Sequence, residues 1–205
     1  MDTSALASFG RALSLWPCIA SAIPNFPGTP AIIGRRPARL ESTPPTAGMR
    51  FRIRDYRPAD FDRLWHIDQL CFPPGIAYTQ MELSGFITRR NAITLVGELS
   101  SEGPRADASP IAGFVVAHPV RARYGRILTL DILPEARRSG LATSLMLECE
   151  RRLRSIGCTD VYLETAVDNE AALRLYRKLG YEIIRTLPEY YSSHALDAFQ
   201  MGKRL

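Results

Sequence analysis

The stretch of sequence that decides the fold is LDILPEARRSGLAT, residues 130–143. Its pattern predicts an apolar strand at Arg126–Leu133, a short basic turn, and an amphipathic helix that begins at Gly140 and runs to Ile156. The first backbone N–H groups of a helix have no partner within it, and the helix dipole is positive at that end. Together with the two arginines of the turn they form a seat for phosphate, and a glycine without a Cβ lets the backbone approach the anion. The spacing matches neither the dinucleotide pattern G-x-G-x-x-G nor a P-loop.

Composition limits the classes of function that the chain can have. Its 205 residues suffice for one domain with a sizeable core, and 46% apolar and 23% charged residues are typical of a soluble globular protein. The net charge of +5 suits an anionic ligand, but no basic stripe with interleaved aromatics indicates nucleic acid. No apolar stretch reaches the length of about 20 residues that spans a membrane. We therefore expect neither a nucleic-acid partner nor a membrane partner.

Cysteine and histidine usage argues against a metal centre. The four cysteines form no C-x-x-C pair, and the three histidines are scattered. We expect no metal and no disulfide framework, and a reducing compartment, the cytoplasm, as the location. Cys149 falls on the apolar face of the predicted helix, where a small buried hydrophobe is the expected role.

The segment 1–48 differs from the rest of the chain. It is rich in Ala, Ser, Pro and Arg, and its only acids are Asp2 and Glu41. Ala12–Ala22 is similar to the apolar part of a secretory signal. The open alternatives are a disordered extension, a targeting leader, and a start assigned too far upstream, with Met49 as the true start. Residues 49–205 are then the one folded domain.

From Met49 onward the pattern predicts a mixed α/β domain in the order β-α-α-β-β-β-α-β-α-β-β. Asp60 is expected to cap the first helix, and the long helix is expected to bury its apolar stripe down to Ile156 and to end at Gly157. The other expected elements are strands at Phe51–Arg54, Ile93–Glu98, Ile111–Ala117, Val161–Thr165, Tyr181–Arg185 and Ala198–Met201, a helix at Thr79–Arg90, and a helix capped by Asp168 or Asn169 and closed by Gly180.

Four motifs occur in the order and spacing of one known family. They are Arg137-Arg138-x-Gly140-Leu141-Ala142, Leu163-Glu164-Thr165, the run from Asn169 through Ala172 to Leu175-Tyr176, and Leu179-Gly180-Tyr181. Together they resemble the GNAT family of acetyl-CoA-dependent N-acetyltransferases over roughly residues 49–205. Tyr190-Tyr191, followed by Asp197-Ala198, is similar to the N-terminal protein acetyltransferases of that family, and most to the RimI-like ribosomal-protein alanine acetyltransferases. The resemblance implies the GNAT fold, a mixed central β-sheet flanked by helices in a single domain.

The resemblance assigns a set of residues to acetyl-CoA. The strand backbone at Leu130, Asp131 and Ile132 is expected beside the pantetheine arm. Asn169 matches an asparagine that contacts this arm, although a helix N-cap alone also explains an asparagine there. The Asp131 carboxylate is open to two interpretations, a second base that reads the substrate ammonium or a side chain in solvent. The residues expected around the pyrophosphate are Arg138, Ser139, Gly140, Leu141, Ala142 and Thr143.

The resemblance also implies two catalytic residues. Glu164 matches a proposed general base, and an α-ammonium with a pKa of about 8 is acidic enough to lose its proton to a carboxylate, directly or through water. The alternative for Glu164 is a surface or paired strand residue. Tyr176 matches the tyrosine that protonates the departing CoA thiolate, and a phenol with a pKa of about 10 can do so. Its alternative is a core aromatic, because it also lies on the apolar stripe of its helix.

The sequence says least about which amine accepts the acetyl group. Tyr190 and Tyr191 are expected to line a peptide-entry groove, or else to be ordinary loop aromatics. The segment Cys71–Tyr78 lacks the proline-tryptophan-serine run of RimI-like enzymes. The expected reaction is direct transfer, in a ternary complex, from acetyl-CoA to a primary amine, first of all the N-terminus of a protein, ribosomal proteins among them. The alternatives are acetylation of a small-molecule amine and a non-catalytic acyl-CoA-binding module.

Overall fold

The computed structural model describes residues 50–99, 110–121, 123–191 and 195–205. All of them belong to one compact unit, Pro44–Leu205. The expectations for segment 1–48 fall outside the described residues. Within the described ranges, no helix is long and apolar enough to cross a membrane.

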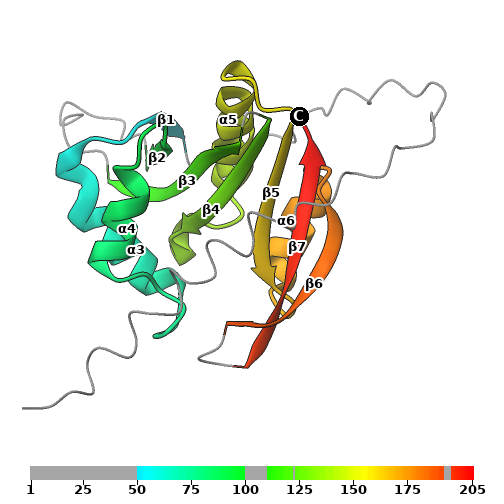
Figure 1. The fold of residues 1–205 in the computed structure, drawn as a ribbon. Helices are drawn as coiled ribbons and strands as arrows, with labels where there is room; N and C mark the ends of the chain where they lie inside the picture. Colours follow the sequence, from blue (N-terminus) through cyan, green and yellow to red (C-terminus); the bar gives the residue numbers. More distant parts are fainter. Residues whose placement is uncertain (1–49, 100–109, 122, 192–194) are drawn as a thin grey trace, which may run out of the picture. The chain divides into compact units, whose positions relative to one another are not determined.

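A seven-stranded sheet forms the centre of the domain, in the order β1-β2-β3-β4-β5-β7-β6 (Figure 1). Neighbouring strands are antiparallel except β4 and β5, which are parallel. The strands are β1 (Phe51–Asp55), β2 (Ile93–Leu99), β3 (Ile111–Arg121), β4 (Tyr124–Ile132), β5 (Asp160–Ala166), β6 (Glu182–Tyr191) and β7 (Leu196–Arg204).

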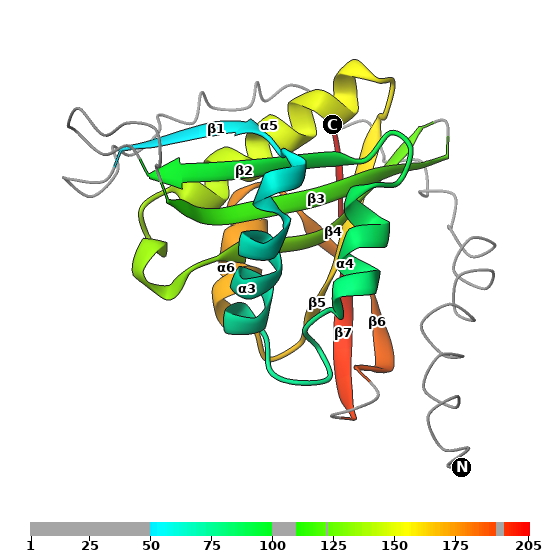
Figure 2. The same ribbon diagram turned by 90° about the vertical axis from the view of Figure 1, so that its left-hand side faces the viewer.

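Among the residues that the structure describes, four α-helices cover the sheet. Figure 2 shows α3 and α4 in front of β3 and β4, with α5 behind them. The helices are α3 (Phe61–Cys71), α4 (Gln80–Ile87), α5 (Leu141–Ser155) and α6 (Glu170–Lys178), with 3₁₀ turns at Pro58–Asp60 and Pro134–Ala136. The predicted order of elements and the mixed α/β class are confirmed.

Most helix ends lie where the sequence places them. Gly140 is the N-cap of α5 at φ 89°, a left-handed conformation that costs glycine little. Gly157 follows the helix at φ 93°. Asn169 caps α6, since its side chain accepts a hydrogen bond from the Ala172 N–H.

Three expectations about helices are wrong. The helix expected at Thr79–Arg90 already ends at Ile87. Asp60 makes no side-chain cap for α3, because its carboxylate instead accepts hydrogen bonds from Arg54 and from the Arg57 N–H. Ile156 is 52% exposed. It lies beyond the last residue of α5, where the chain already turns toward Gly157 and the apolar stripe no longer faces the sheet.

The parallel neighbours β4 and β5 part soon after they meet. Their register contains only three pairs, which end at Arg126 opposite Tyr162. Beyond this point β5 continues to pair with β7 as far as Ala166, while β4 continues to pair with β3 as far as Ile132. A register shift in the β3–β4 ladder leaves Leu128 as an extra residue of β4. The sheet therefore opens between β4 and β5 at the carboxyl ends of both strands.

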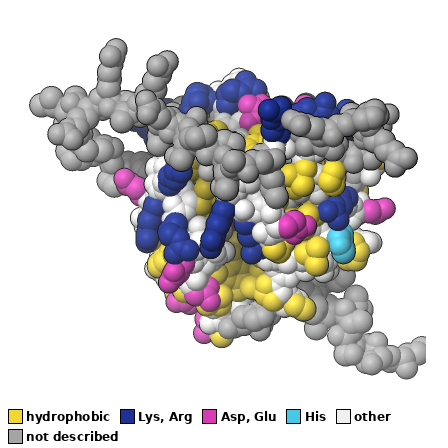
Figure 3. Space-filling view, turned by 180° about the vertical axis from the view of Figure 1, so that it is seen from behind, with side chains coloured by type: hydrophobic (Ala, Val, Ile, Leu, Met, Phe, Trp, Pro, Cys, Tyr) yellow, Lys and Arg dark blue, Asp and Glu magenta, His cyan; other side chains and the backbone are white. Residues whose placement is uncertain are grey.

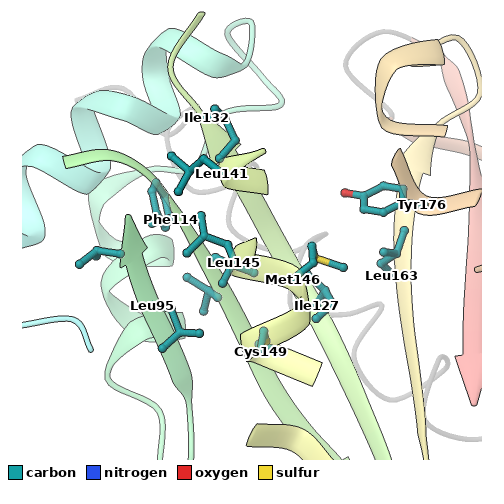
Figure 4. Close-up of a cluster of buried hydrophobic side chains, with 14 of the residues drawn as sticks. Leu95, Phe114, Ile127, Ile132, Leu141, Leu145, Met146, Cys149, Leu163 and Tyr176 are labelled. Atoms are coloured by element: carbon teal, nitrogen blue, oxygen red, sulfur yellow. The ribbon is translucent and has the colours of Figure 1, made fainter. Parts of the chain in front are cut away.

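Buried apolar side chains fill the space on both sides of this opening. Figure 4 shows Ile132 and Leu141 close together on the β4–α5 side, with Met146 and Cys149 further along α5. Leu163 and Tyr176 face them from β5 and α6. Cys149 is fully buried, as the sequence predicts.

Candidate active site

The turn that precedes α5 is shaped to receive an anion. Ser139 is buried, and its hydroxyl donates to the Ala136 carbonyl at 2.7 Å and accepts from the Leu141 N–H at 3.3 Å. The Ser144 N–H donates to the Gly140 carbonyl, which closes the first turn of the helix. The N–H groups that precede it, those of Gly140, Ala142 and Thr143, therefore have no carbonyl within the helix to bind. Arg138 is in the left-handed region at φ 61°, and such a turn directs successive N–H groups inward.

The two arginines of the turn have different positions. Arg137 donates from Nε to the Ile132 carbonyl at 3.2 Å and so fastens the turn to the end of β4. Arg138 is exposed beside the anion seat. Seen from behind, the face that carries α5 and α6 shows a column of Lys and Arg side chains next to a hollow lined by hydrophobic side chains (Figure 3). Such a face suits a ligand with a phosphate end and an apolar arm.

Asp131 is buried without an ionic partner. Its side chain is 0% exposed, so the expectation of a side chain in solvent is wrong. One carboxylate oxygen accepts a hydrogen bond from Thr129, and the other has no partner among the described residues. Burial raises its pKa well above the usual range, and the charge of Asp68 adds to the effect. A carboxyl group in such a site favours the neutral, protonated form.

Asp68 lies on α3 and holds the segment Phe72–Tyr78 against this helix. It accepts hydrogen bonds from the Tyr78 N–H at 2.8 Å and from Gln69 at 3.0 Å. Burial raises its pKa to about 6 despite these bonds. Tyr78 reaches β4 as well, since its hydroxyl donates to the Leu128 carbonyl at 3.3 Å. The loop is thus held against the strand at the residue that the register shift leaves unpaired.

Glu164 lies on β5 just beyond the last β4–β5 pair. Its side chain is 5% exposed and ion-paired with Arg126 at 3.0 Å. The Arg126 Nε donates to one carboxylate oxygen and the Gln200 Nε2 to the other, both at 3.0 Å. The structure thus shows Glu164 as a paired strand residue. A carboxylate that is held in this way still presents lone pairs, so its role as a base remains a prediction.

Tyr176 occupies the core and faces the opening. It is 8% exposed, and its ring lies 5.8 Å from that of Tyr181. Burial raises the pKa of its phenol, and the charges of Tyr191 and Asp131 add to the shift. The hydroxyl therefore keeps its proton at physiological pH, which leaves it able to donate that proton.

The tyrosine pair ends β6. The rings of Tyr190 and Tyr191 meet edge to face, with centroids 5.1 Å apart. The Tyr190 hydroxyl accepts a hydrogen bond from Arg126 at 3.0 Å, which brings β6 to the opening. Burial raises the pKa of Tyr191 to about 12. Asp197 accepts the Glu189 N–H at 2.8 Å and so fixes the turn before the pair.

The segment Phe72–Tyr78 borders a groove of about 730 Å³. Trp65 and Gln69 both donate to the Tyr78 carbonyl, at 3.3 and 2.8 Å, and so hold one wall in place. Pro74, Ala77 and Met81 add apolar surface. In the part of the chain that the structure describes, no cluster of three His, Cys, Asp or Glu side chains forms a metal site.

The structure brings together most of the residues expected in the site. Arg126 joins Glu164 to Tyr190 where the strands part, Tyr191 packs edge to face on Tyr190, and Tyr176 faces the opening. The anion-binding turn lies at the end of β4 beside Ile132, and Leu130 is half-buried on the same strand. Asn169 uses its amide oxygen as the α6 cap and keeps its NH₂ group for another contact, so its role toward the cofactor remains a prediction.

Arg126 and Gln200 escaped the sequence reasoning, and Tyr78 entered it only as part of the segment Cys71–Tyr78. Arg126 offered the clearest signal, because an arginine inside a buried strand requires a partner. The partner itself lies 38 positions away, and only the fold shows it.

Two parallel strands part beside a helix start that suits an anion, and ionisable side chains lie at the opening. These features are typical of one class of protein, the transferases that take an acyl group from a coenzyme A thioester. The chain belongs to the Acetyltransferase (GNAT) family, whose family model matches residues 61–181. It is thus an acetyl-CoA-dependent N-acetyltransferase by class.

Known proteins of similar sequence and fold agree with this assignment. The N-alpha-acetyltransferase of Sulfurisphaera tokodaii is 25% identical over 77% of this chain and 95% of its own. Ard1 from Thermoplasma volcanium has a TM-score of 0.66 and 26% identity over 76% of this chain and 97% of its own. The ribosomal-protein-S18-alanine N-acetyltransferase of Escherichia coli shares the fold, with a TM-score of 0.64 and 20% identity over 76% of this chain and 94% of its own.

Proposed function

We propose that the chain transfers the acetyl group of acetyl-CoA to the α-amine at the N-terminus of a protein. The parting of β4 and β5 beyond Arg126 and Tyr162 carries the proposal. It frees the edge of β4 for a ligand arm directly beside the anion seat, and it places Glu164 and Tyr176 at the opening. The name of the S. tokodaii relative supports an N-terminal acceptor.

Each side chain of the opening has a chemical task in this proposal. The N–H groups of Gly140, Ala142 and Thr143 hold the pyrophosphate, and Arg138 adds positive charge. Backbone N–H groups of β4 near Ile132 bind the thioester carbonyl, where negative charge develops during attack. Glu164 accepts the proton of the attacking ammonium, directly or through water, and Tyr176 delivers a proton to the sulfur that leaves.

The acceptor enters between two walls in this proposal. Tyr190 and Tyr191 form one wall, and Phe72–Tyr78 with its groove forms the other. The acceptor could be a ribosomal protein, as in RimI-like enzymes, or a small amine. The experiment described next distinguishes these outcomes. We further propose the cytoplasm as the location, since acetyl-CoA, nascent N-termini and reduced thiols such as Cys71 occur together there.

The deciding experiment incubates the protein with acetyl-CoA and a library of N-terminal peptides and detects products by mass. Acetylation of free N-termini supports the proposal. Turnover of small amines alone contradicts the acceptor, and tight CoA binding without turnover of any amine makes the chain a binding module.

Two substitutions test the catalytic roles. We expect Glu164→Gln and Tyr176→Phe each to lower kcat by about 100-fold, the usual range for a lost acid or base, with unchanged CoA affinity. Glu170→Gln and Tyr56→Phe are matched controls, because Glu170 is exposed in an ion pair with Arg174 and Tyr56 follows β1. Unchanged turnover in both site variants would refute these roles.

A further inference from the structure

Arg126 occupies the point at which the sheet opens. It is the last residue of β4 with a partner on β5, and its side chain is 17% exposed. The guanidinium binds groups from two other strands, the Glu164 carboxylate of β5 and the Tyr190 hydroxyl of β6, each at 3.0 Å. One rigid planar group therefore sets the spacing between a carboxylate and a phenol at the mouth of the site.

The hydrogen bond to Tyr190 fixes the direction in which that phenol donates. A phenol has one proton and acceptor lone pairs, and the Arg126 Nη2 occupies a lone pair. The guanidinium has no lone pair to offer, so the Tyr190 proton points to another acceptor. Glu164 is acceptor-only when ionised, and Arg126 and Gln200 each engage one of its oxygens. The result is a phenol that keeps its proton for another acceptor, next to a carboxylate that can accept further hydrogen bonds.

This donor–acceptor pair matches the end of a polypeptide chain. An N-terminal residue carries an ammonium donor and a carbonyl acceptor separated by a single Cα. A lysine ε-ammonium ends four methylenes from its backbone and has no carbonyl beside it. A site that hydrogen-bonds two groups rejects a substrate that lacks one of them, because its own polar group is left unpaired.

We propose that Arg126 is a positioning residue that makes the enzyme select α-amines over ε-amines, by holding Glu164 for the ammonium and Tyr190 for the first carbonyl. This inference rests on the proposed function and names the feature of the acceptor that is read. Arg126 itself touches neither reacting atom. Because lysine lacks the planar fork of arginine, it can bind only one of the two partners well.

The test measures kcat/KM for two peptides with each variant. One peptide has a free N-terminus and no lysine, and the other has the same sequence with a blocked N-terminus and one internal lysine. We expect Arg126→Gln to lower the α-amine value by about 100-fold and the ε-amine value by less than about threefold, since two charge-assisted contacts are lost only for the first. Arg126→Lys should lose about 10-fold for the α-amine.

Two further variants separate positioning from general damage to the fold. Tyr190→Phe removes the phenol donor and leaves the Arg126–Glu164 pair intact, so it should lower the α-to-ε ratio by about 10-fold with an unchanged KM for acetyl-CoA. Arg174→Gln is the matched control, because Arg174 is 69% exposed in an ion pair on α6.

The outcomes are distinct. A wild-type enzyme that acetylates N-termini, together with Arg126→Gln and Tyr190→Phe variants that retain the wild-type ratio, overturns the inference and leaves the proposed function standing. An equal loss on both peptides in both variants also overturns it. A wild-type protein that acetylates neither peptide overturns the proposed function, and the inference falls with it.

Discussion

Gly113 on β3 lies directly opposite the part of β4 that borders the opening, and replacing it by alanine is a sharp test of the site. A Cβ at this position would lie 2.6 Å from the Asp131 carbonyl oxygen and 2.6 Å from the Ile132 Cδ1. Ordinary contacts begin at 3.4 Å, so the strand must retreat by about 0.8 Å from the carbonyl oxygen and the Ile132 side chain must shift as well. The Asp131 carbonyl oxygen belongs to the backbone, so it cannot rotate away as a side chain can.

Two magnitudes follow from this displacement. Overpacking of a tight interior costs about 1–3 kcal/mol, and the reduced freedom of alanine in the unfolded chain returns about 0.5–1 kcal/mol. We therefore expect Gly113→Ala to lower the free energy of unfolding by about 1–2 kcal/mol. Because a misplacement of about 1 Å near the reacting groups can cost up to 100-fold in rate, we expect kcat/KM for acetyl-CoA to fall by at least about 10-fold.

Urea unfolding and steady-state kinetics provide both numbers, and Gly85→Ala is the control. A Cβ at Gly85, inside α4, meets nothing within 4 Å, so this variant should gain up to about 1 kcal/mol from helix propensity and keep its activity. The reasoning is refuted if Gly113→Ala unfolds within about 0.5 kcal/mol of the wild type and keeps its kcat/KM.

Two further predictions concern stability. The folded state holds the Asp68 proton more tightly than the unfolded chain, with a pKa of about 6 against 3.8, so stability falls as pH rises through this window, by up to about 3 kcal/mol. Asp68→Asn should remove this part of the fall between about pH 4 and pH 7.5, and urea titrations that show the same pH slope as the wild type would contradict the burial argument. Thr79→Ala removes the N-cap of α4, whose hydroxyl accepts the Glu82 N–H, and should cost about 1 kcal/mol in thermal unfolding. Thr88→Ala, at the other end of α4, should cost only a few tenths of that, and equal losses would count against the capping explanation.

The sequence predicts the elements of this fold well because their signals are local. Gly140, Asn169 and Gly157 act within one turn of the helices that they begin or end, and each has the role that its residue type indicates. The same local logic fails where a side chain has a stronger distant partner. Asp60 is the example, since Arg54 binds the carboxylate that would have capped α3.

The site could be predicted only in part. The turn before α5 is contiguous in sequence, so the residues proposed to bind the anion could be named from the pattern. The link of Arg126 to Glu164 and Tyr190 joins three strands over separations of 38 and 64 positions, and no periodicity carries that information. The burial of Asp131 likewise depends on the packing of α3, a segment far away in sequence, against β4. The predicted roles of Glu164, Tyr176 and the tyrosine pair await the experiments described above.

The short pairing between β4 and β5 also bears on the stability of the protein in the absence of substrate. Beyond the third pair, each strand presents an unpaired edge to the other, and an open strand edge is a template for addition of a foreign strand and for aggregation. A ligand arm bound along β4, as proposed, would cover one of these edges and would stabilise the folded chain increasingly as the ligand concentration rises. Binding of acetyl-CoA would thus protect the folded chain against strand addition as well as supply the reaction.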